Sequence, residues 1–542
     1  MSERPLPLDY GAFLHPPSAL FRDYLGGRPS AAPFFDGGRW DMDALAEKSE
    51  AALRLDRPRA AVAEALARQQ EARGNVRAAA RARELAAADA VAVVTGQQAG
   101  LFGGPLFVLY KALGALKVAD LLRGRRQGPV VPVFWVASDD HDFAEVRTAT
   151  VLDEAGLLHT VRYNPHQEPL AEPASRIVLD DTMAALVEEL RAALPATPPR
   201  DEVLAALAAC YRPGATLAGA FASFISFIMP ELVVLDPDDP ALKAAMAPVM
   251  EREIVERSPT SRLAEEIGPR LLAAGYHQQV AVRPGFLNLF VVTQRQRRSL
   301  AARNGDLEIR GAGERLSVDE ATRRLREQPG EWSPGVLLRP LAQDFILPTA
   351  AYVGGPAEIA YHAQIGPSYG HFGIPRALLL PRPSVTLVEP AQARALEAEA
   401  LTLPELQADS EALLSRWARE AYPDVEEAFT RVRASLQQDM AAVEEALGRY
   451  DPTLKAAADS ALGRALHQID GLNEKAVRVL KKRDQSRADR LRRTRDALLP
   501  GGLLQERGLG LIGLLARQGR PVVDVIRERI DPWAQGHQVI PL

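Results

Sequence analysis

Two short apolar runs and the residues that follow them predict a βαβ unit near residue 90. Ala90–Thr95 is a β-branched run ended by Gly96-Gln97-Gln98, and Val130–Ala137 is a second run ended by Ser-Asp-Asp-His-Asp. Short apolar runs bounded by turn residues are typical of buried parallel strands. Between them, apolar positions recur at helical spacing from Pro105 to about Leu122. The crossover of such a unit is expected to be right-handed.

Three later segments carry the same strand signal, and helical stretches separate them. They are Leu232–Leu235, Ala351–Gly354, and Ala377–Leu380 together with Val385–Val388 on either side of Pro-Arg-Pro. Five parallel strands spread over about 300 residues predict the α/β class, a Rossmann-like sheet with insertions near 146–205 and 275–335. The second insertion contains an alternating run, Gln279–Thr293, which we interpret as a hairpin around Pro284-Gly285.

Residues 391–500 predict an all-α coiled-coil domain. Apolar residues repeat at three- and four-residue spacing along Phe429, Val432, Leu436, Met440, Val443, Leu447, Tyr450 and Leu454, and again along Leu462, Leu466, Ile469, Ala476, Leu480 and Leu491. Residues 401–450 hold 10 acidic and 5 basic residues, whereas residues 471–500 hold 4 acidic and 10 basic. Opposite charges favour an antiparallel hairpin.

The length of this apolar seam predicts a homodimer formed through the coiled coil, because a lone helical pair leaves apolar surface in water. The alternative is that the hairpin folds back on its own core. We therefore divide the chain into a core, 1–390, a coiled-coil domain, 391–500, and a tail, 501–542, that returns to the core.

The overall composition argues against several classes of protein. Lys and Arg (65) nearly balance Asp and Glu (70) in 542 residues, for a net charge of −5, so no nucleic-acid partner is expected, because phosphate neutralisation requires a basic excess. The single cysteine, Cys210, excludes intrachain disulfides and cysteine-rich zinc sites. Neither a signal-peptide pattern nor an apolar run of about 18 residues occurs. We expect a cytoplasmic protein without a membrane partner.

The first strand leads into a glycine-rich turn that ends in Gly103-Gly104-Pro105. Ligands of open α/β sheets bind beyond the carboxyl ends of the strands. Glycines before a helix N-terminus expose backbone N–H groups that can meet an anion. Gln97 and Gln98 add neutral donors and acceptors there. The alternative is a loop whose glycines only turn the chain.

The second strand ends in four consecutive polar residues, Asp139, Asp140, His141 and Asp142. Such residues can orient an amine, exchange a proton, or simply form a hydrogen-bonded turn. Neighbouring side chains diverge and cannot all ligate one ion. We therefore predict no metal site.

A third strand end repeats the pattern of the first. Tyr352 is followed by Gly354-Gly355-Pro356 and a helix, on which Glu358 and His362 share one face at i and i+4. Two strand–Gly-Gly-Pro–helix corners are expected to flank one cleft. We predict that the cleft is built from Gln97, Gln98, Asp140, His141, Tyr352, Glu358 and His362.

Three long motifs at these positions resemble the bacillithiol-biosynthesis cysteine-adding enzyme family, BshC. They are TGQQAGLFGGPLFVLYKALGALK, PVFWVASDDHDFAEV and LLRPLAQDFILPTAAYVGGPAEIAYHAQ. The resemblance extends over the whole chain and includes the LQER at 504–507. Asp139 stands where many relatives are expected to carry Glu.

The resemblance implies a core related to class I aminoacyl-tRNA synthetases and nucleotidyltransferases, with two connective insertions and a dimerising coiled coil. It implies addition of cysteine to glucosaminyl-malate, the last step to bacillithiol. Amide formation requires an activated carboxylate, so ATP with Mg is an expected cosubstrate, although the HxGH and KMSKS signatures of the synthetases are absent. The other hypotheses are a nucleotidyltransferase acting on another acceptor and a non-catalytic, nucleotide-responsive assembly protein.

This chemistry assigns expected roles to the candidate residues. Lys111, Gly103, Gly104 and Gly355 would bind the nucleotide or another anion. Asp140, His141 or Glu358 would take a proton from the sugar ammonium. Gln97, Gln98, Asp142, Tyr352 and His362 would bind the substrates.

Overall fold

The computed structural model describes residues 7–542 except 14, 37, 39, 409 and 484. The described residues form two compact units. An α/β unit comprises the chain up to Val388 together with Leu503–Leu542, and a helical unit comprises Glu389–Gly502. The C-terminal segment therefore belongs to the α/β unit.

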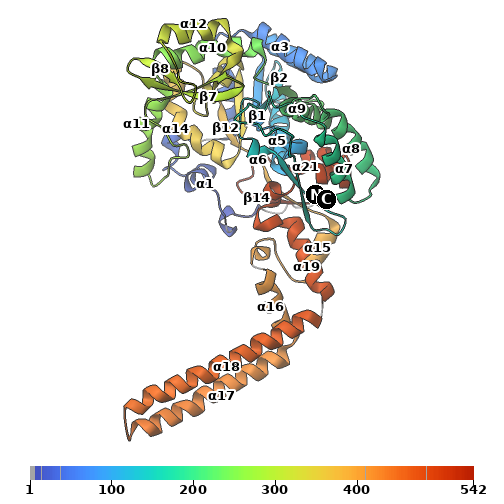
Figure 1. Ribbon diagram of the computed structural model, residues 1–542, viewed down its shortest axis with the longest axis vertical. Coiled ribbons are helices and arrows are strands. Elements are labelled where there is room, and N and C mark those ends of the chain that lie inside the picture. Colours follow the sequence, from blue (N-terminus) through green and yellow to red (C-terminus); the bar gives the residue numbers. More distant parts are fainter. Residues whose placement is uncertain (1–6, 14, 37, 39, 409, 484) are drawn as a thin grey trace. The chain divides into compact units, whose positions relative to one another are not determined.

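The α/β unit is built on a five-stranded parallel sheet in the order β12-β11-β1-β2-β5. Strands β1, β2 and β12 of this sheet are labelled in Figure 1. The strands are β1 (Val91–Gln97), β2 (Val130–Val136), β5 (Val233–Leu235), β11 (Thr349–Gly354) and β12 (Leu378–Pro381). In the centre, Val94 pairs with Tyr352 on one side and Val133 on the other. The predicted Rossmann-like class is confirmed.

Helix α5 (Leu106–Arg123) is the crossover between β1 and β2. Most of its residues are buried because the helix packs against the central strands β1 and β2. At Gly114 a Cβ atom would come within 2.9 Å of Pro383 and 3.2 Å of Val353. Glycine thus allows the close approach of helix and strand. Four helices precede β1: α1 (Ala19–Leu25), α2 (Met42–Ala52), α3 (Arg59–Ala72) and α4 (Val76–Arg83).

The direction of the strand order changes between β1 and β11. From β1 the strands β2 and β5 are added in turn toward one edge of the sheet, and β11 and β12 are then added toward the opposite edge. In open α/β sheets the crevice beyond the carboxyl ends at such a point is the usual ligand site. Gln97 at the end of β1 and Gly354 at the end of β11 both lie at this edge.

Two insertions extend the sheet unit. Between β2 and β5 lie α6 (Phe143–Val146), β3 (Thr148–Leu152), β4 (Leu158–Arg162), α7 (Thr182–Ala193), α8 (Pro198–Cys210) and α9 (Leu217–Ile228). After α10 (Pro240–Val255) and α11 (Pro259–Ala273) comes a second sheet in the order β10-β6-β7-β8-β9. Its elements are β6 (Phe286–Thr293), β7 (Gln296–Arg303), β8 (Asp306–Ile309), β9 (Glu314–Leu316), α12 (Val318–Glu327) and β10 (Trp332–Pro334).

The predicted hairpin around Pro284-Gly285 is wrong. Phe286–Thr293 is one strand, and the hairpin turn lies at Gln294-Arg295, whose φ angles are 51° and 66°. Two consecutive positive φ angles characterise the turn that best matches the twist of a hairpin. Glycine or asparagine usually occupies such a turn, so Gln-Arg carried no turn signal. Proline at 284 cannot donate to a ladder.

Val385–Val388 also leaves the main sheet. It lies in β13 (Ser384–Val388), which pairs in parallel with β14 (His537–Pro541) near the C-terminus. The remaining helices of this unit are α13 (Arg339–Ile346), α14 (Pro356–Phe372), α20 (Gln505–Gly508), α21 (Leu511–Gln518) and α22 (Val522–Arg529). A buried ion pair between Arg382 and Glu506, 2.6 Å apart, fixes the C-terminal segment beside β12.

The helical unit contains α15 (Pro390–Ala398), α16 (Ser410–Ala421), α17 (Pro423–Gly448), α18 (Thr453–Arg483) and α19 (Gln485–Leu498). Helices α17 and α18 form an antiparallel hairpin, across which Arg433 pairs with Asp470 at 2.5 Å. No helix in the described ranges is both long and apolar enough to cross a membrane.

Candidate active site

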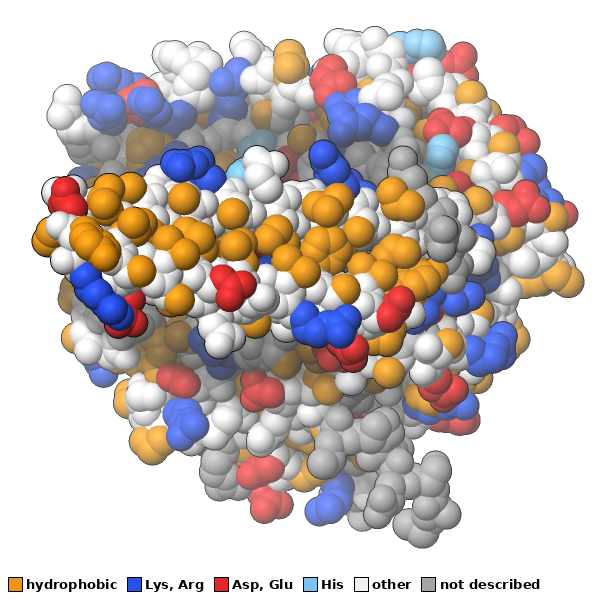
Figure 2. Space-filling model, turned by 90° about the horizontal axis from the view of Figure 1, so that it is seen from below, with side chains coloured by type: hydrophobic (Ala, Val, Ile, Leu, Met, Phe, Trp, Pro, Cys, Tyr) orange, Lys and Arg blue, Asp and Glu red, His pale blue; other side chains and the backbone are white. Residues whose placement is uncertain are grey.

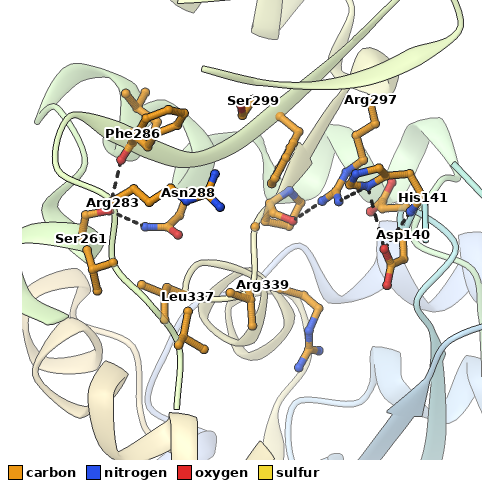
Figure 3. A pocket seen from close by; sticks show the side chains of 18 of the residues that line it. Asp140, His141, Ser261, Arg283, Phe286, Asn288, Arg297, Ser299, Leu337 and Arg339 are labelled. Carbon is orange, nitrogen blue, oxygen red and sulfur yellow. Dashed lines mark hydrogen bonds and ion pairs between the residues drawn. The ribbon is translucent and has the colours of Figure 1, made fainter. Parts of the chain in front are cut away.

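Two adjoining cavities open at the carboxyl edge of the parallel sheet. The larger, about 670 Å³, lies between the end of β2 and the inserted sheet, and we name it the Asp140 cavity (Figure 3). The smaller, about 430 Å³, lies at the ends of β1 and β11, and we name it the Tyr352 cavity. Trp135, Ala137, Val336 and Arg339 line both. The two cavities therefore share a wall.

The predicted site residues are divided between these cavities. Gln97, Gln98, Lys111, Tyr352, Gly355 and Glu358 line the Tyr352 cavity, and Asp140 and His141 line the Asp140 cavity. Gln98 Nε2 donates to Asp140 Oδ2 at 2.7 Å and connects the two groups. Gly103, Gly104, Asp142 and His362 line neither cavity.

Glu358 is the centre of a buried network at the start of α14. Its carboxylate accepts hydrogen bonds from the Tyr352 hydroxyl at 2.5 Å and the Gly355 N–H at 2.7 Å. It also forms an ion pair with Lys111. Burial acts to raise the pKa of Glu358, but Lys111 and these hydrogen bonds outweigh it, so the pKa lies below its ordinary value. Glu358 is therefore an ionised, fully partnered acceptor rather than a free base.

Lys111 has no donor left for a ligand. Its side chain is 1% exposed, and its ammonium group contacts the Gly96 carbonyl at 2.5 Å, Gln97 Oε1 at 2.9 Å and the Glu358 carboxylate. An ammonium group has three hydrogens. The network instead fixes Gln97 and Glu358 at the cavity wall.

The glycine corners do not form the predicted anion sites. The Gly103 N–H donates to the Tyr211 hydroxyl at 3.2 Å and the Gly104 N–H to the Leu101 carbonyl at 3.0 Å. The Leu106 N–H at the start of α5 donates to Leu509, and the Gly355 N–H is taken by Glu358. The chain's own acceptors occupy these donors. The residues expected to hold ATP phosphates therefore do not fit that group.

The Ser-Asp-Asp-His-Asp turn sends its side chains in different directions. Asp139 pairs with fully buried Lys243 of α10 at 2.5 Å, which anchors the turn to the fold. Asp142 caps α6 by accepting from the Glu145 N–H at 3.2 Å. Asp139, Asp140 and His141 all line the cavity, but only Asp140 and His141 are not held by an ion pair with a lysine. Asp142 is thus a structural cap, not the predicted substrate ligand.

Asp140 and His141 are the proton-transfer candidates that remain. Asp140 Oδ1 accepts from the His141 N–H at 2.7 Å. Burial, followed by the nearby Arg297 guanidinium, lowers the pKa of His141 below its ordinary value of 6.5. The imidazole is therefore uncharged at neutral pH, the state that a general base requires. Arg297 Nη1 lies 3.4 Å from His141 Nδ1.

His362 is separated from the cavities by aromatic rings. Its side chain is 2% exposed, with ring centroids 5.4 Å from Tyr352 and 5.1 Å from Tyr361. No described residue forms a hydrogen bond with either ring nitrogen, and burial lowers its pKa well below the ordinary value. Glu358 lies on the first turn of α14 and reaches the cavity, whereas His362, one turn later, lies behind Tyr352. The prediction that His362 lines the cleft is wrong.

Several functional candidates were missing from the predicted site. Arg339 lines both cavities and donates to the Tyr361 hydroxyl at 2.9 Å. Arg507 lines the Tyr352 cavity, and no described residue accepts a hydrogen bond from its guanidinium. Both stand in motifs that signalled the family, LLRPLAQDF and LQER. Nothing in the sequence pointed to Arg297 or Asn288. Among the described residues no group of three or more His, Cys, Asp or Glu side chains could hold a metal.

Two family models cover this site and the helical unit. Residues 7–383 match "Bacillithiol biosynthesis BshC, N-terminal Rossmann-like domain", and residues 385–542 match "Bacillithiol biosynthesis BshC, C-terminal coiled-coil domain". The chain belongs to the BshC family. The expected family is thereby confirmed, as is the coiled-coil character of the second unit.

The chain aligns with proteins named BshC over most of their lengths. The protein named "Putative cysteine ligase BshC" from Salinibacter ruber is 32% identical over 99% of this chain and 100% of its own. Proteins of the same name from Koribacter versatilis and Chlorobaculum tepidum are 32% and 31% identical, over 94% and 83% of each chain. BshC is thus an enzyme family. The Asp140 cavity lies within the matched Rossmann-like domain, whereas Arg507, outside that match, adds to the lining of the Tyr352 cavity.

Proposed function

We propose that this BshC family member forms the amide bond between the cysteine carboxylate and the amine of glucosaminyl-malate, the last step to bacillithiol. The observation that carries the proposal is the pair of adjoining cavities with Asp140 and His141 beside their shared wall. Two cavities that meet provide separate places for two reactants and bring their reacting ends together.

The Tyr352 cavity suits an anionic part of a substrate. Lys111, Arg339, Arg382 and Arg507 line it, against Glu145 and Glu358. Glu358 neutralises Lys111 and Glu506 neutralises Arg382. Arg339 and Arg507 remain, opposed by Glu145 alone, so the cavity keeps a net positive charge. Guanidinium groups bind carboxylates well, which favours the malyl carboxylates as their partners.

The Asp140 cavity suits the attacking amine. An ammonium group must lose a proton before it can attack a carbonyl carbon. Asp140 attracts the ammonium, and uncharged His141 beside it accepts the proton. Gln98 holds Asp140 in place through its 2.7 Å hydrogen bond.

Amide formation in water is uphill, so the cysteine carboxylate must carry a leaving group. The bond to that group breaks as the amine nitrogen bonds to the carbonyl carbon, and His141 takes the amine proton. No step is assigned to a nucleotide, because the hydrogen-bond donors of Gly103, Gly104, Gly355 and Lys111 are occupied within the chain. Reconstitution with and without Mg-ATP shows whether ATP activates cysteine.

The same proposal includes a homodimer formed through the helical hairpin. An apolar band follows the hairpin (Figure 2). Val432, Val443, Leu472 and Val479 in this hairpin are 50%, 44%, 60% and 58% exposed. Apolar surface of this extent is usually covered by a partner, and a second copy with the same seam is the simplest one.

The test is reconstitution with purified protein, glucosaminyl-malate and cysteine, with and without Mg-ATP, followed by mass spectrometry and nucleotide analysis. Formation of bacillithiol supports the proposal, and its dependence on ATP shows how cysteine is activated. Pyrophosphate release without cysteine would instead indicate a nucleotidyltransferase acting on another acceptor. Absence of any reaction, with folded protein and intact substrates, would refute ligation by this chain alone.

A further inference from the structure

Asn288 is a polar residue among large apolar side chains on strand β6. Alternation along the strand buries Leu287 and Leu289, which are 4% and 0% exposed, on the core side. The less buried Phe286, Asn288 and Phe290 line the Asp140 cavity, to which Leu287 also contributes. Asn288 thus places a polar group at the cavity surface between two aromatic side chains of the same strand.

A chain of hydrogen bonds fixes which way the Asn288 carboxamide points. Its Nδ2 donates to Thr260 Oγ1 and to Ser261 Oγ, both at 2.8 Å. The Thr260 hydroxyl in turn donates to Glu253 Oε1 at 2.8 Å, and the Ser261 hydroxyl to the Phe286 carbonyl at 3.1 Å.

The ends of this chain can only accept. The Phe286 carbonyl has no hydrogen to give, and Glu253 Oε1 already accepts from the Asn288 backbone N–H at 3.0 Å. With the hydroxyl protons of Thr260 and Ser261 on these acceptors, both hydroxyl oxygens accept from Asn288 Nδ2. Both Nδ2 hydrogens of Asn288 are therefore used in the hydrogen bonds to Thr260 and Ser261.

The carboxamide oxygen is the atom left over. No residue that the structure describes donates to Asn288 Oδ1, and the side chain lies on the open wall of the cavity (Figure 3). A fixed, unpartnered carbonyl oxygen recognises a hydrogen-bond donor of a ligand, either a hydroxyl or an ammonium group.

The charge around the cavity decides between these donors. Arg283, Arg297 and Arg339 line it, against Asp139 and Asp140. Asp139 is already paired with Lys243, and Arg283 lies beside Asn288 (Figure 3). An ammonium group is therefore disfavoured at Asn288, in contrast to the far end of the cavity, where Asp140 attracts it. A neutral hydroxyl meets no such repulsion. The apolar surfaces of Phe286 and Leu337 beside the amide suit a ring that bears hydroxyl groups.

We propose that the Asp140 cavity binds the sugar ring of the acceptor and that Asn288 Oδ1 accepts a hydrogen bond from one of its hydroxyl groups. This inference rests on the proposed function, because it takes glucosaminyl-malate as the acceptor. The ring then lies between Asn288 and the Asp140–His141 pair, and Arg339 connects it to the cavity for the malyl group. Asn288 is in this view a specificity residue for the acceptor.

The test compares glucosaminyl-malate with analogues that each lack one sugar hydroxyl, by titration calorimetry on the full-length protein and on Asn288→Ala. One analogue is expected to bind the unsubstituted protein about tenfold more weakly than the parent compound, the loss typical of one hydrogen bond. Asn288→Ala should bind the parent about tenfold more weakly and no longer distinguish that analogue. The KM for cysteine should change less than about twofold, since the missing contact is to the acceptor.

Three results would overturn the inference: equal binding of every analogue by the unsubstituted protein, unchanged discrimination by Asn288→Ala, or a raised KM for cysteine with unchanged acceptor binding. The analogue series on the unsubstituted protein decides the matter even if Asn288→Ala is unstable. Failure of the unsubstituted protein to ligate cysteine would refute the proposed function. Normal ligation without the predicted pattern would refute only the role of Asn288.

Discussion

Replacing Lys111 by methionine tests whether the Lys111–Glu358 pair supports the site or acts on substrate. Methionine keeps most of the volume of lysine and removes its charge. The Glu358 carboxylate would then keep only the Tyr352 hydroxyl and the Gly355 N–H as partners. The Gly96 carbonyl and Gln97 Oε1 would each lose a donor.

The expected loss follows from the burial of the pair. Removing one partner of a buried ion pair costs about 3–5 kcal/mol, because the other charge stays uncompensated. Lys111 is 1% exposed, but the Glu358 side chain keeps 23% exposure, and water reduces the cost. We therefore expect Lys111→Met to lower the free energy of unfolding of the α/β unit by about 3 kcal/mol. Combining it with Glu358→Gln should recover most of this loss, since no unpaired buried charge remains.

Urea unfolding followed by tryptophan fluorescence measures this effect, because four of the five tryptophans lie in the α/β unit. The double variant should also regain most of the ligation rate. The opposite pattern would refute the structural role: unchanged unfolding of Lys111→Met and Glu358→Gln, with ligation abolished in both and in the double variant. Lys111 and Glu358 would then act on the substrate or a phosphate group directly.

Four further predictions follow from the geometry. The kcat/KM for ligation should decrease at acidic pH as His141 becomes protonated, with an apparent pKa lower than 6.5. His141→Gln should remove this acidic limb of the pH profile. Arg339→Gln should raise the KM for the acceptor about 10- to 100-fold, as expected for a lost charge-assisted hydrogen bond; an unchanged KM would contradict its role. Replacing Leu436, Met440 and Val443 by Asp should give a monomer in sedimentation, and a dimeric variant would exclude the hairpin as the interface. Burial lowers the pKa of His537 to about 4. The free energy of unfolding should therefore keep its full value above pH 6.5 and fall by up to about 3 kcal/mol as the pH drops to 4 and below. His537→Gln should lack this pH dependence in unfolding experiments.

The parallel sheet could be predicted from the sequence because its strands are buried on both faces. A strand such as Val130–Val136 must then be apolar throughout, and the polar residues after it mark its end. The second sheet was less predictable, because its hairpin turn consists of Gln294 and Arg295 at positive φ instead of the usual glycine or asparagine. Val385–Val388 had the composition of a strand, but nothing in the local pattern named His537–Pro541 as its partner.

The site was partly predictable for a related reason. Gln97 and Tyr352 lie in the last residues of β1 and β11 and Asp140 follows β2, and parallel strands bring such residues to one edge. The cavity residues Asn288 and Arg297 come instead from a strand in an insertion, and only the tertiary packing places that insertion over the edge. Helical spacing correctly put Glu358 and His362 on one helix, but it could not show that Tyr352 covers the second of them.

The two Gly-Gly-Pro corners show why a motif alone does not define an anion site. Both place glycines and a proline before a helix, and both were expected to present free N–H groups. At the first corner Tyr211, Leu101 and Leu509 supply the acceptors from the chain itself. At the second, Glu358 on the same helix occupies the N-terminus with a carboxylate, and Lys111 neutralises it. A helix N-terminus binds a ligand anion only where the fold leaves its donors unused. In this chain the net positive charge of the Tyr352 cavity comes instead from Arg339 and Arg507, one of which lines both cavities.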